Sequence, residues 1–322
     1  MKITVRLGVT AALLSVCIGP SASVYAQAFP SKPIRIIVGA NPGTPLDLGA
    51  RLFGGEMSRR LGQPIVTETR PGAGSTIAGK AVASSPPDGY TLFYGNATSQ
   101  HPVLVKENSL DATKDYAPIS NMMVGAAVFY GRGSLPVRSL QDLVAYSKAN
   151  PGKLTFGTPA PNYDLIMVMI KKSTGLEYLG IPYYKTQDSG PPLLAEEVDF
   201  VASSASKFTS QLPTGRVRAL FATSRSSLLP DTPSLADLGL PGFEDAGVNW
   251  GLWAPNATPR NVIQVLNSAA IAAIKIPEIS AKLVAATGYN PTGSTAEEQM
   301  RIYNASVGFL QEAARLANFQ PQ

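Results

Sequence analysis

The sequence predicts an α/β fold of two lobes, each a mainly parallel sheet flanked by helices. The first observation is length, because 322 residues correspond to about two domains. The second is pattern, since short β-rich runs alternate with stretches of helical periodicity, as in βαβ units with parallel strands. The third is composition: 44% hydrophobic and 15% charged residues suit a chain that buries a sizeable core.

The first part of the chain alternates three strands with two helices. Residues 34–38 read IRIIV, and apolar residues at helical spacing then continue to a stop at Gly62. A Pro-Pro-Asp-Gly turn at 86–89 precedes the third strand. We expect strands at 34–38, 65–69 and 91–95, and helices at 48–61 and 77–83.

The rest of the chain continues the alternation, with a connector containing Pro and Gly from 230 to 250. We expect strands at 124–130, 154–157, 181–184, 198–201 and 219–223, and helices at 140–148, 263–274 and 300–316. We assign residues 27–128 and 251–322 to the first domain and residues 129–250 to the second.

The beginning of the chain is typical of a signal peptide, which we place at residues 1–26. Lys2 and Arg6 precede an apolar stretch at 7–18, and cleavage is expected after Ala26. About a dozen apolar residues are too few for a membrane span, which needs about 20. A lipid-attachment site at Cys17 is the alternative.

Charge and composition exclude several classes of function. The net charge of +5 comes from scattered residues without a basic run, so we expect no nucleic-acid partner. Cys17 is the only cysteine and His101 the only histidine, which argues against thiolate catalysis, a catalytic triad or a metal centre. We expect a protein that is not an enzyme and has no cofactor, with His101 as a loop residue before Pro102.

Four loops follow predicted strands, and ligands of open α/β sheets lie beyond the carboxyl ends of strands. These loops comprise residues 41–47, 70–76, 96–99 and 158–162. The first two also open helices, whose free N–H groups and dipole favour an anion such as a carboxylate. The alternative for each is an ordinary capped turn, and for Asp47 a carboxylate that fixes its loop.

Two nucleotide-binding motifs are nearly matched in the second loop. Residues 74–80 read GSTIAGK, but Ala81 stands where a P-loop needs Ser or Thr. Residues 72–74 begin a dinucleotide fingerprint, but Ile77 replaces its third glycine. We reject both.

Several segments in a fixed order resemble one family, the Bug-type substrate-binding receptors of tripartite tricarboxylate transporters. They are FPSKPIRIIV at 29–38, LGQPIV at 61–66, RPGAG at 70–74, PDGYTL at 87–92, KDYAPI at 114–119, PYYK at 182–185, LPDTPS at 229–234 and WGLWAP at 250–255. The resemblance covers about residues 29 to 318.

The resemblance implies a periplasmic receptor of the type II-like, Venus flytrap form, which closes on a small carboxylate and delivers it to membrane transporter subunits. We expect a monomer. The carboxylate is expected between the first two loops, with the 158–162 loop and residues after the strand ending at 201 opposite. The expected ligand-binding residues are Asn41, Gly43, Thr44, Leu46, Asp47, Gly72, Ala73, Gly74, Ser75, Thr98, Thr158, Ala160, Asn162, Tyr184 and Ser203.

The chain departs from the family pattern inside these loops. Gly43 is followed by Thr44, Pro45 and Leu46 instead of a second glycine and a hydroxyl pair. Ala97-Thr98 replaces a Thr-His pair, residues 159–164 lack the usual Gly and hydroxyl, and Ser203 replaces an aspartate. We expect an unusual acid, bulkier or more apolar, aromatic or dicarboxylic. The alternatives are a ligand sensor that feeds a signalling partner and an exported hydrolase.

Overall fold

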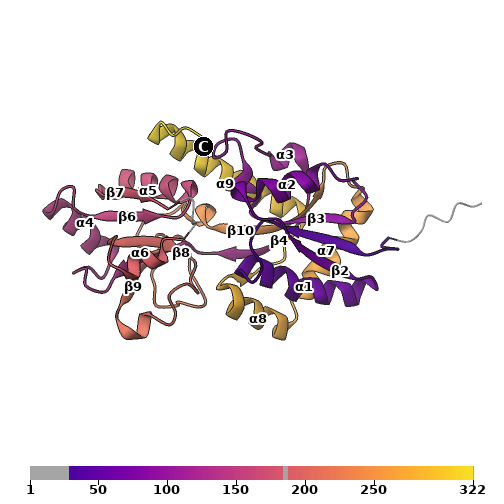
Figure 1. The fold of residues 1–322 in the computed structure, drawn as a ribbon, viewed down its shortest axis with the longest axis horizontal. Coiled ribbons are helices and arrows are strands. Elements are labelled where there is room, and N and C mark those ends of the chain that lie inside the picture. Colours follow the sequence, from indigo (N-terminus) through magenta and orange to yellow (C-terminus); the bar gives the residue numbers. More distant parts are fainter. Residues whose placement is uncertain (1–28, 184–187, 322) are drawn as a thin grey trace, which may run out of the picture.

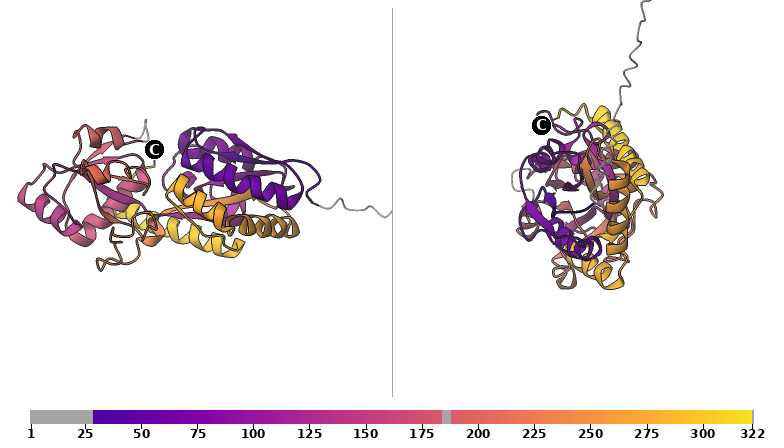
Figure 2. Two further views of the ribbon diagram at one scale, coloured as in Figure 1. Left: turned by 90° about the horizontal axis from the view of Figure 1, so that it is seen from below. Right: turned by 90° about the vertical axis from the view of Figure 1, so that its right-hand side faces the viewer.

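The computed structural model describes residues 29–183 and 188–321, which form two lobes built on separate sheets (Figure 1). The predicted signal peptide and Tyr184 lie outside the described residues. Lobe 1 carries a six-stranded sheet and lobe 2 a five-stranded one, so the two-lobed α/β prediction is confirmed. One view of Figure 2 shows the lobes side by side along the long axis.

Lobe 1 contains the beginning and the end of the described chain. Its strand order is β11-β4-β10-β3-β1-β2. Its strands are β1 (Ile34–Val38), β2 (Ile65–Thr69), β3 (Thr91–Gly95), β4 (Tyr116–Gly125), β10 (Val248–Pro255) and β11 (Asn290–Pro291). Its helices are α1 (Pro45–Leu61), η1 (Ala73–Ser75), α2 (Thr76–Ala83), η2 (Ala97–Gln100), α3 (Ala112–Asp115), α7 (Arg260–Ile274), α8 (Pro277–Thr287) and α9 (Ala296–Ala317).

Lobe 2 is formed by the middle of the chain, with the strand order β7-β6-β8-β5-β9. Its strands are β5 (Val128–Arg132), β6 (Thr155–Thr158), β7 (Leu179–Pro182), β8 (Phe200–Ser203) and β9 (Val217–Ala222). Its helices are α4 (Leu140–Ala149), α5 (Pro161–Thr174), α6 (Gly190–Leu194) and η3 (Leu212–Thr214), and η4 (Glu244–Ala246) leads back to lobe 1.

Each sheet is mixed rather than mainly parallel. In lobe 1, β1 pairs in parallel with β2 and β3, whereas β10 runs antiparallel to both β3 and β4. In lobe 2, β6 is parallel to β7 and β8, and β5 is antiparallel to β8 and β9. The antiparallel strands β4, β5 and β10 are those that enter or leave the crossings between the lobes. The chain crosses from lobe 1 to lobe 2 at Ala126 and Ala127. The strand expected at 124–130 is therefore two strands, β4 and β5, on either side of this crossing.

Helices cover both faces of the lobe 1 sheet. Successive strand residues point to opposite faces, so Ile36 packs with Phe53 of α1 and Leu266 of α7. Ile37 packs on the other face with Val82 of α2 and Val307 of α9. Lobe 2 has its own apolar clusters on its two sheet faces. The strands of both sheets are therefore held rigidly, and the loops at their ends keep fixed positions.

No single helix in the described ranges is long and apolar enough to cross a membrane. Helices α7 and α8 are long and apolar enough only when taken together, and the chain bends by 81° between them. Their apolar residues, including Leu266 and Leu283, belong to the lobe 1 core.

Helix α9 joins the lobes. Its first turns pack on lobe 1 through Tyr303 and Val307. Farther along, Leu310 and Ala313 pack with Leu165 of α5 in lobe 2 and with Leu104 of lobe 1. A second contact lies at the end of α8, where the Ser206 hydroxyl donates to the Thr287 carbonyl at 3.2 Å. Loops from both lobes therefore face each other across a short distance.

Candidate ligand-binding site

A cavity of about 530 Å³ lies between the two lobes. Lobe 1 contributes residues of the loops after β2 and β3, and lobe 2 contributes the segment after β6. The lining residues are Ala73, Gly74, Ser99, Leu104, Val105, Lys106, Glu107 and Asn108 from lobe 1, and Pro159, Ala160, Pro161 and Asn162 from lobe 2. The carboxyl ends of strands in both lobes therefore meet at one cavity of the size of a small-molecule site.

The loop after β2 has an unusual backbone. Gly72, Ala73, Gly74 and Ser75 all have positive φ, at 124°, 46°, 60° and 74°. For Ala73 and Ser75, which have a Cβ, this left-handed conformation costs about 1–2 kcal/mol each. Successive N–H groups in such a turn form a concavity that suits an anion. Ala73 and Gly74 of this turn line the cavity just before α2.

Hydroxyl groups around this loop brace it. Ser75 Oγ donates to the Gly39 carbonyl at 3.0 Å and Thr76 Oγ1 to the Ala73 carbonyl at 2.7 Å. Ser99 Oγ donates to the Gly74 carbonyl at 2.9 Å, which ties the loop to η2. Since these hydroxyls have backbone acceptors, the loop offers a ligand its N–H groups instead.

Close packing fixes the same loop against the end of β1. A Cβ at Gly39 would lie 2.3 Å from the Ser75 Cβ, so only glycine fits at position 39. Gln100 Nε2 adds a bond to the Ser75 carbonyl at 3.1 Å. The loops after β1, β2 and β3 therefore form one interlocked unit.

The first predicted loop, residues 41–47, does not line the cavity. Asp47 is buried and accepts from the Gly43 N–H at 2.9 Å, and Arg51 Nε lies 2.9 Å from its other oxygen. Burial alone would raise the pKa of Asp47, but the bonds from Arg51 and Gly43 outweigh it and lower that pKa. Thr44 Oγ1 donates to the Asn41 carbonyl, and Leu46 packs in the lobe 1 core. These contacts favour the interpretation of Asp47 as a residue that fixes its loop.

The third loop contributes to a smaller cavity of about 40 Å³ beside the main one. Asn96 accepts from the Thr98 N–H at 3.0 Å and caps η2. The lining residues are Asn96, Thr98, Ser99, Leu104, Asn162, Asp245, Ala246, Gly247, Ser306 and Leu310. Ser99, Leu104 and Asn162 line both cavities, so the two adjoin.

His101 is a loop residue, as expected. Its Nδ1 accepts from the Val103 N–H at 3.1 Å, and its ring packs edge-on against Tyr303. Burial lowers the pKa of His101.

The wall from lobe 2 is the start of α5. Ala160 precedes the helix without a side-chain cap, and Pro161 is its first residue. Thr158 Oγ1 donates to the Ala160 carbonyl at 3.1 Å, and the Tyr163 N–H donates to the same carbonyl at 3.0 Å. Burial raises the pKa of Tyr163 to about 12, so this phenol stays neutral. Ser203 ends β8 and does not line the cavity.

Sequence reasoning missed the irregular segment from 104 to 108, because it follows no strand and carries no motif. Ser99, Pro159 and Pro161 lie within the predicted loops and line the cavity, but they were not among the residues expected to bind the ligand.

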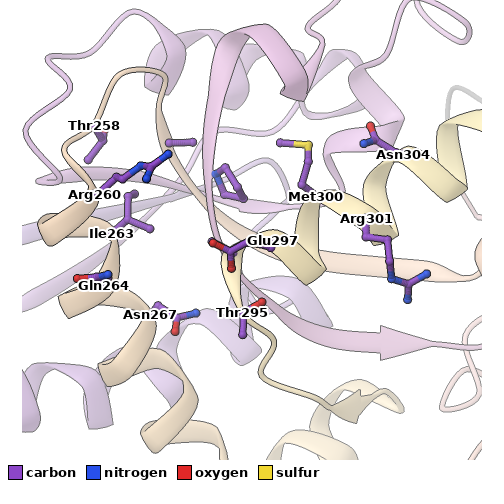
Figure 3. Close-up of a pocket in the computed structure, with 13 residues that line it drawn as sticks. Thr258, Arg260, Ile263, Gln264, Asn267, Thr295, Glu297, Met300, Arg301 and Asn304 are labelled. Atoms are coloured by element: carbon purple, nitrogen blue, oxygen red, sulfur yellow. The ribbon is translucent and has the colours of Figure 1, made fainter.

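Another cavity, of about 910 Å³, lies in lobe 1 alone (Figure 3). Figure 3 shows Arg260, Ile263, Gln264 and Asn267 along one helix and Glu297, Met300, Arg301 and Asn304 along another. It touches neither the loops after β2 and β3 nor lobe 2, so closure of the lobes could not enclose a ligand there. Within residues 29–183 and 188–321 no group of three His, Cys, Asp or Glu side chains is placed to hold a metal ion.

Comparison with known proteins relates this chain to one family of transport receptors. A family model described as "Tripartite tricarboxylate transporter family receptor" matches residues 50–309. A UPF0065 protein of Bordetella bronchiseptica is 32% identical over 306 residues, which are 93% of this chain and 90% of that one.

Two solved structures resemble this chain over most of its length. The periplasmic binding protein BugD is 27% identical with a TM-score of 0.73, over 91% of this chain and 100% of that one. The R. palustris protein Rpa4515 with adipate is 25% identical with a TM-score of 0.77, over the same shares of the two chains.

Proposed function

Because this chain belongs to the tripartite tricarboxylate transporter receptor family, we propose that its inter-lobe cavity is where it captures a small organic carboxylate. The observation that carries the assignment of the site is the left-handed loop at 72–75, of which Ala73 and Gly74 line a cavity shared by both lobes. The adipate bound to Rpa4515, a structural neighbour, supports a carboxylate ligand.

In this proposal the ligand carboxylate accepts hydrogen bonds from the N–H groups of Ala73 and Gly74. Charge-assisted bonds of this kind are about twice as strong as neutral ones, and the start of α2 adds a favourable dipole. Gly72, Ser75 and Thr98 hold the loop, and Asn162 contacts the ligand from lobe 2. Asn41, Gly43, Thr44, Leu46 and Asp47 belong to the first loop, which follows Gly39, the acceptor of the Ser75 hydroxyl.

The receptor works by closure. We divide the chain into residues 27–128 with 251–322, and residues 129–250, which approach each other around the crossings at Ala126 and Gly247. A ligand that touches both lobes stabilises the closed state by its differential contacts. We propose that membrane transporter subunits recognise the closed form, and that the receptor acts as a monomer.

Export follows from the predicted signal peptide at 1–26. Family members such as BugD are periplasmic binding proteins, and cleavage after Ala26 would release this receptor into the same compartment.

The experiment is a calorimetric screen of residues 27–322, unfolded and refolded to remove bound ligand. The panel contains aliphatic mono- and dicarboxylates, amino acids and aromatic carboxylates. We expect one class of acid to bind with a micromolar or lower dissociation constant. Binding should weaken in Gly74→Ala, which strains the loop (φ 60°), and not in the matched Gly215→Ala in lobe 2 (φ 71°). Binding of no acid would contradict the proposal.

A further inference from the structure

A polar site of another kind lies inside lobe 1, beside the strands β4 and β10. A cavity of about 10 Å³ is lined there by Asn121 of β4, Trp253 of β10 and Gln299 of α9. The three residues are almost fully buried, with exposed fractions of 1%, 3% and 2%. Among the residues that the structure describes, both side-chain amides and the indole N–H have no hydrogen-bond partner. Because the large majority of buried polar groups in native proteins are paired, this cluster points to a bound molecule.

The pairing of the two strands explains why this space exists. Asn121 pairs with Gly251 of β10, and the register of the strands shifts next to this pair, between Trp250 and Gly251. A Cβ at Gly251 would lie 2.1 Å from Gln299 Nε2 and 2.6 Å from Trp253 Nε1. The two nitrogens therefore converge on one small region beside β10, which only glycine leaves open.

The chemistry of the lining suits a neutral molecule that both donates and accepts hydrogen bonds. The indole of Trp253 only donates, whereas the amides of Asn121 and Gln299 donate and accept. The described residues that line this cavity include no charged side chain, so an ion would find no opposite charge. One water molecule can accept from the indole and from one amide N–H, and it can donate to both amide oxygens. A cavity of this volume has room for one water molecule.

Water can reach this site from the cavity between the lobes. Asn96 and Thr98 line both the 10 Å³ cavity and the cavity of about 40 Å³. The latter shares Ser99, Leu104 and Asn162 with the inter-lobe cavity. The three cavities therefore adjoin one another in series, from the space between the lobes to the interior of lobe 1.

We propose that a tightly held water molecule binds between Asn121, Trp253 and Gln299 and forms a structural part of lobe 1. It completes the hydrogen bonding where β4 and β10 depart from regular pairing. It also lies against η2, since Ala97 and Thr98 line the same cavity. This inference does not depend on the proposed function, because it concerns the interior of lobe 1 and requires no organic ligand.

The first measurement is a crystal structure of residues 27–322 without an added acid, at a resolution that shows ordered water. We expect a density peak at hydrogen-bond distance, about 2.7–3.2 Å, from Trp253 Nε1 and from the amides of Asn121 and Gln299. A structure without this peak, in which Gln299 Oε1 accepts directly from the indole N–H, would overturn the proposal.

The second measurement is thermal unfolding of Gln299→Met, which keeps the length of the side chain and removes its amide. The bound water would lose a partner, and we expect the melting temperature to fall by about 2–4 °C. The control Gln311→Met changes an exposed residue of the same helix and should melt like the native chain. If the Gln299 amide had no partner, its removal would relieve a buried unpaired group and raise the melting temperature, and that result would refute the water site.

Discussion

The left-handed loop at 72–75 makes a prediction that separates stability from binding. Ala73 has φ 46° and is exposed, so Ala73→Gly removes a conformational cost of about 1–2 kcal/mol from the folded state. Glycine also gains freedom in the unfolded chain, which subtracts about 0.5–1 kcal/mol. The central values of these ranges leave a net stabilisation of about 0.75 kcal/mol, or a rise in melting temperature of about 1–3 °C for a chain of this size.

The same substitution should harm binding. A glycine at 73 lets the loop visit other conformations, and fixing it again on binding weakens affinity by about twofold to fivefold. The control is Ala257→Gly, because Ala257 is also exposed and left-handed (φ 65°) but lies in a turn before α7. Both variants should melt higher in scanning calorimetry, and only Ala73→Gly should bind the preferred acid more weakly. An Ala73→Gly variant that melts lower than the native chain would refute the claim that Ala73 is held in a strained conformation.

Two further predictions concern the loops behind the site. Gly39→Ala would place a Cβ 2.3 Å from the Ser75 Cβ, and we expect a loss of stability of about 1–3 kcal/mol in urea unfolding. The double variant with Ser75→Gly should recover most of it, and simple additivity would contradict the contact. Asp47 has a lowered pKa in the folded state, so the stability it contributes is present above its unfolded pKa of about 3.9 and is lost as pH falls through the folded value. Asp47→Asn should therefore destabilise the protein at pH 7 and much less at pH 2.5, and an equal loss at both would refute the electrostatic role.

Much of the fold follows from local sequence. The helix expected to stop at Gly62 does so, because Gly62 adopts the left-handed conformation that ends a helix (φ 66°). The strands expected at 34–38, 65–69 and 91–95 are confirmed. In the first and third, apolar residues are buried on both faces of the sheet, and the second consists of residues that favour strands. The domain boundary was placed at 128, but the break between β4 and β5 at Ala126 and Ala127 was not predicted. Both residues are apolar and continue the pattern of the strands on either side, and only the three-dimensional path separates them.

The site was predicted less completely than the fold. The loops at 70–76 and 158–162 follow strands, and the structure brings both to one cavity. The segment from 104 to 108 also lines this cavity, but tertiary contacts of Leu104 with α5 and α9 place it there, and these leave no local signal. Ser75 was among the expected ligand-binding residues, whereas its hydroxyl and that of Thr76 donate to backbone carbonyls. Their use as braces depends on the left-handed backbone, which non-glycine residues adopt only when the surrounding structure enforces it.

The most direct test of the central claim is a crystal structure of residues 27–322 with the acid that binds best in the screen. We predict the ligand in the cavity between the lobes, with carboxylate oxygens about 3 Å from the backbone nitrogens of Ala73 and Gly74. A ligand bound in the groove between α7 and α9, or bound to lobe 2 alone, would contradict the account.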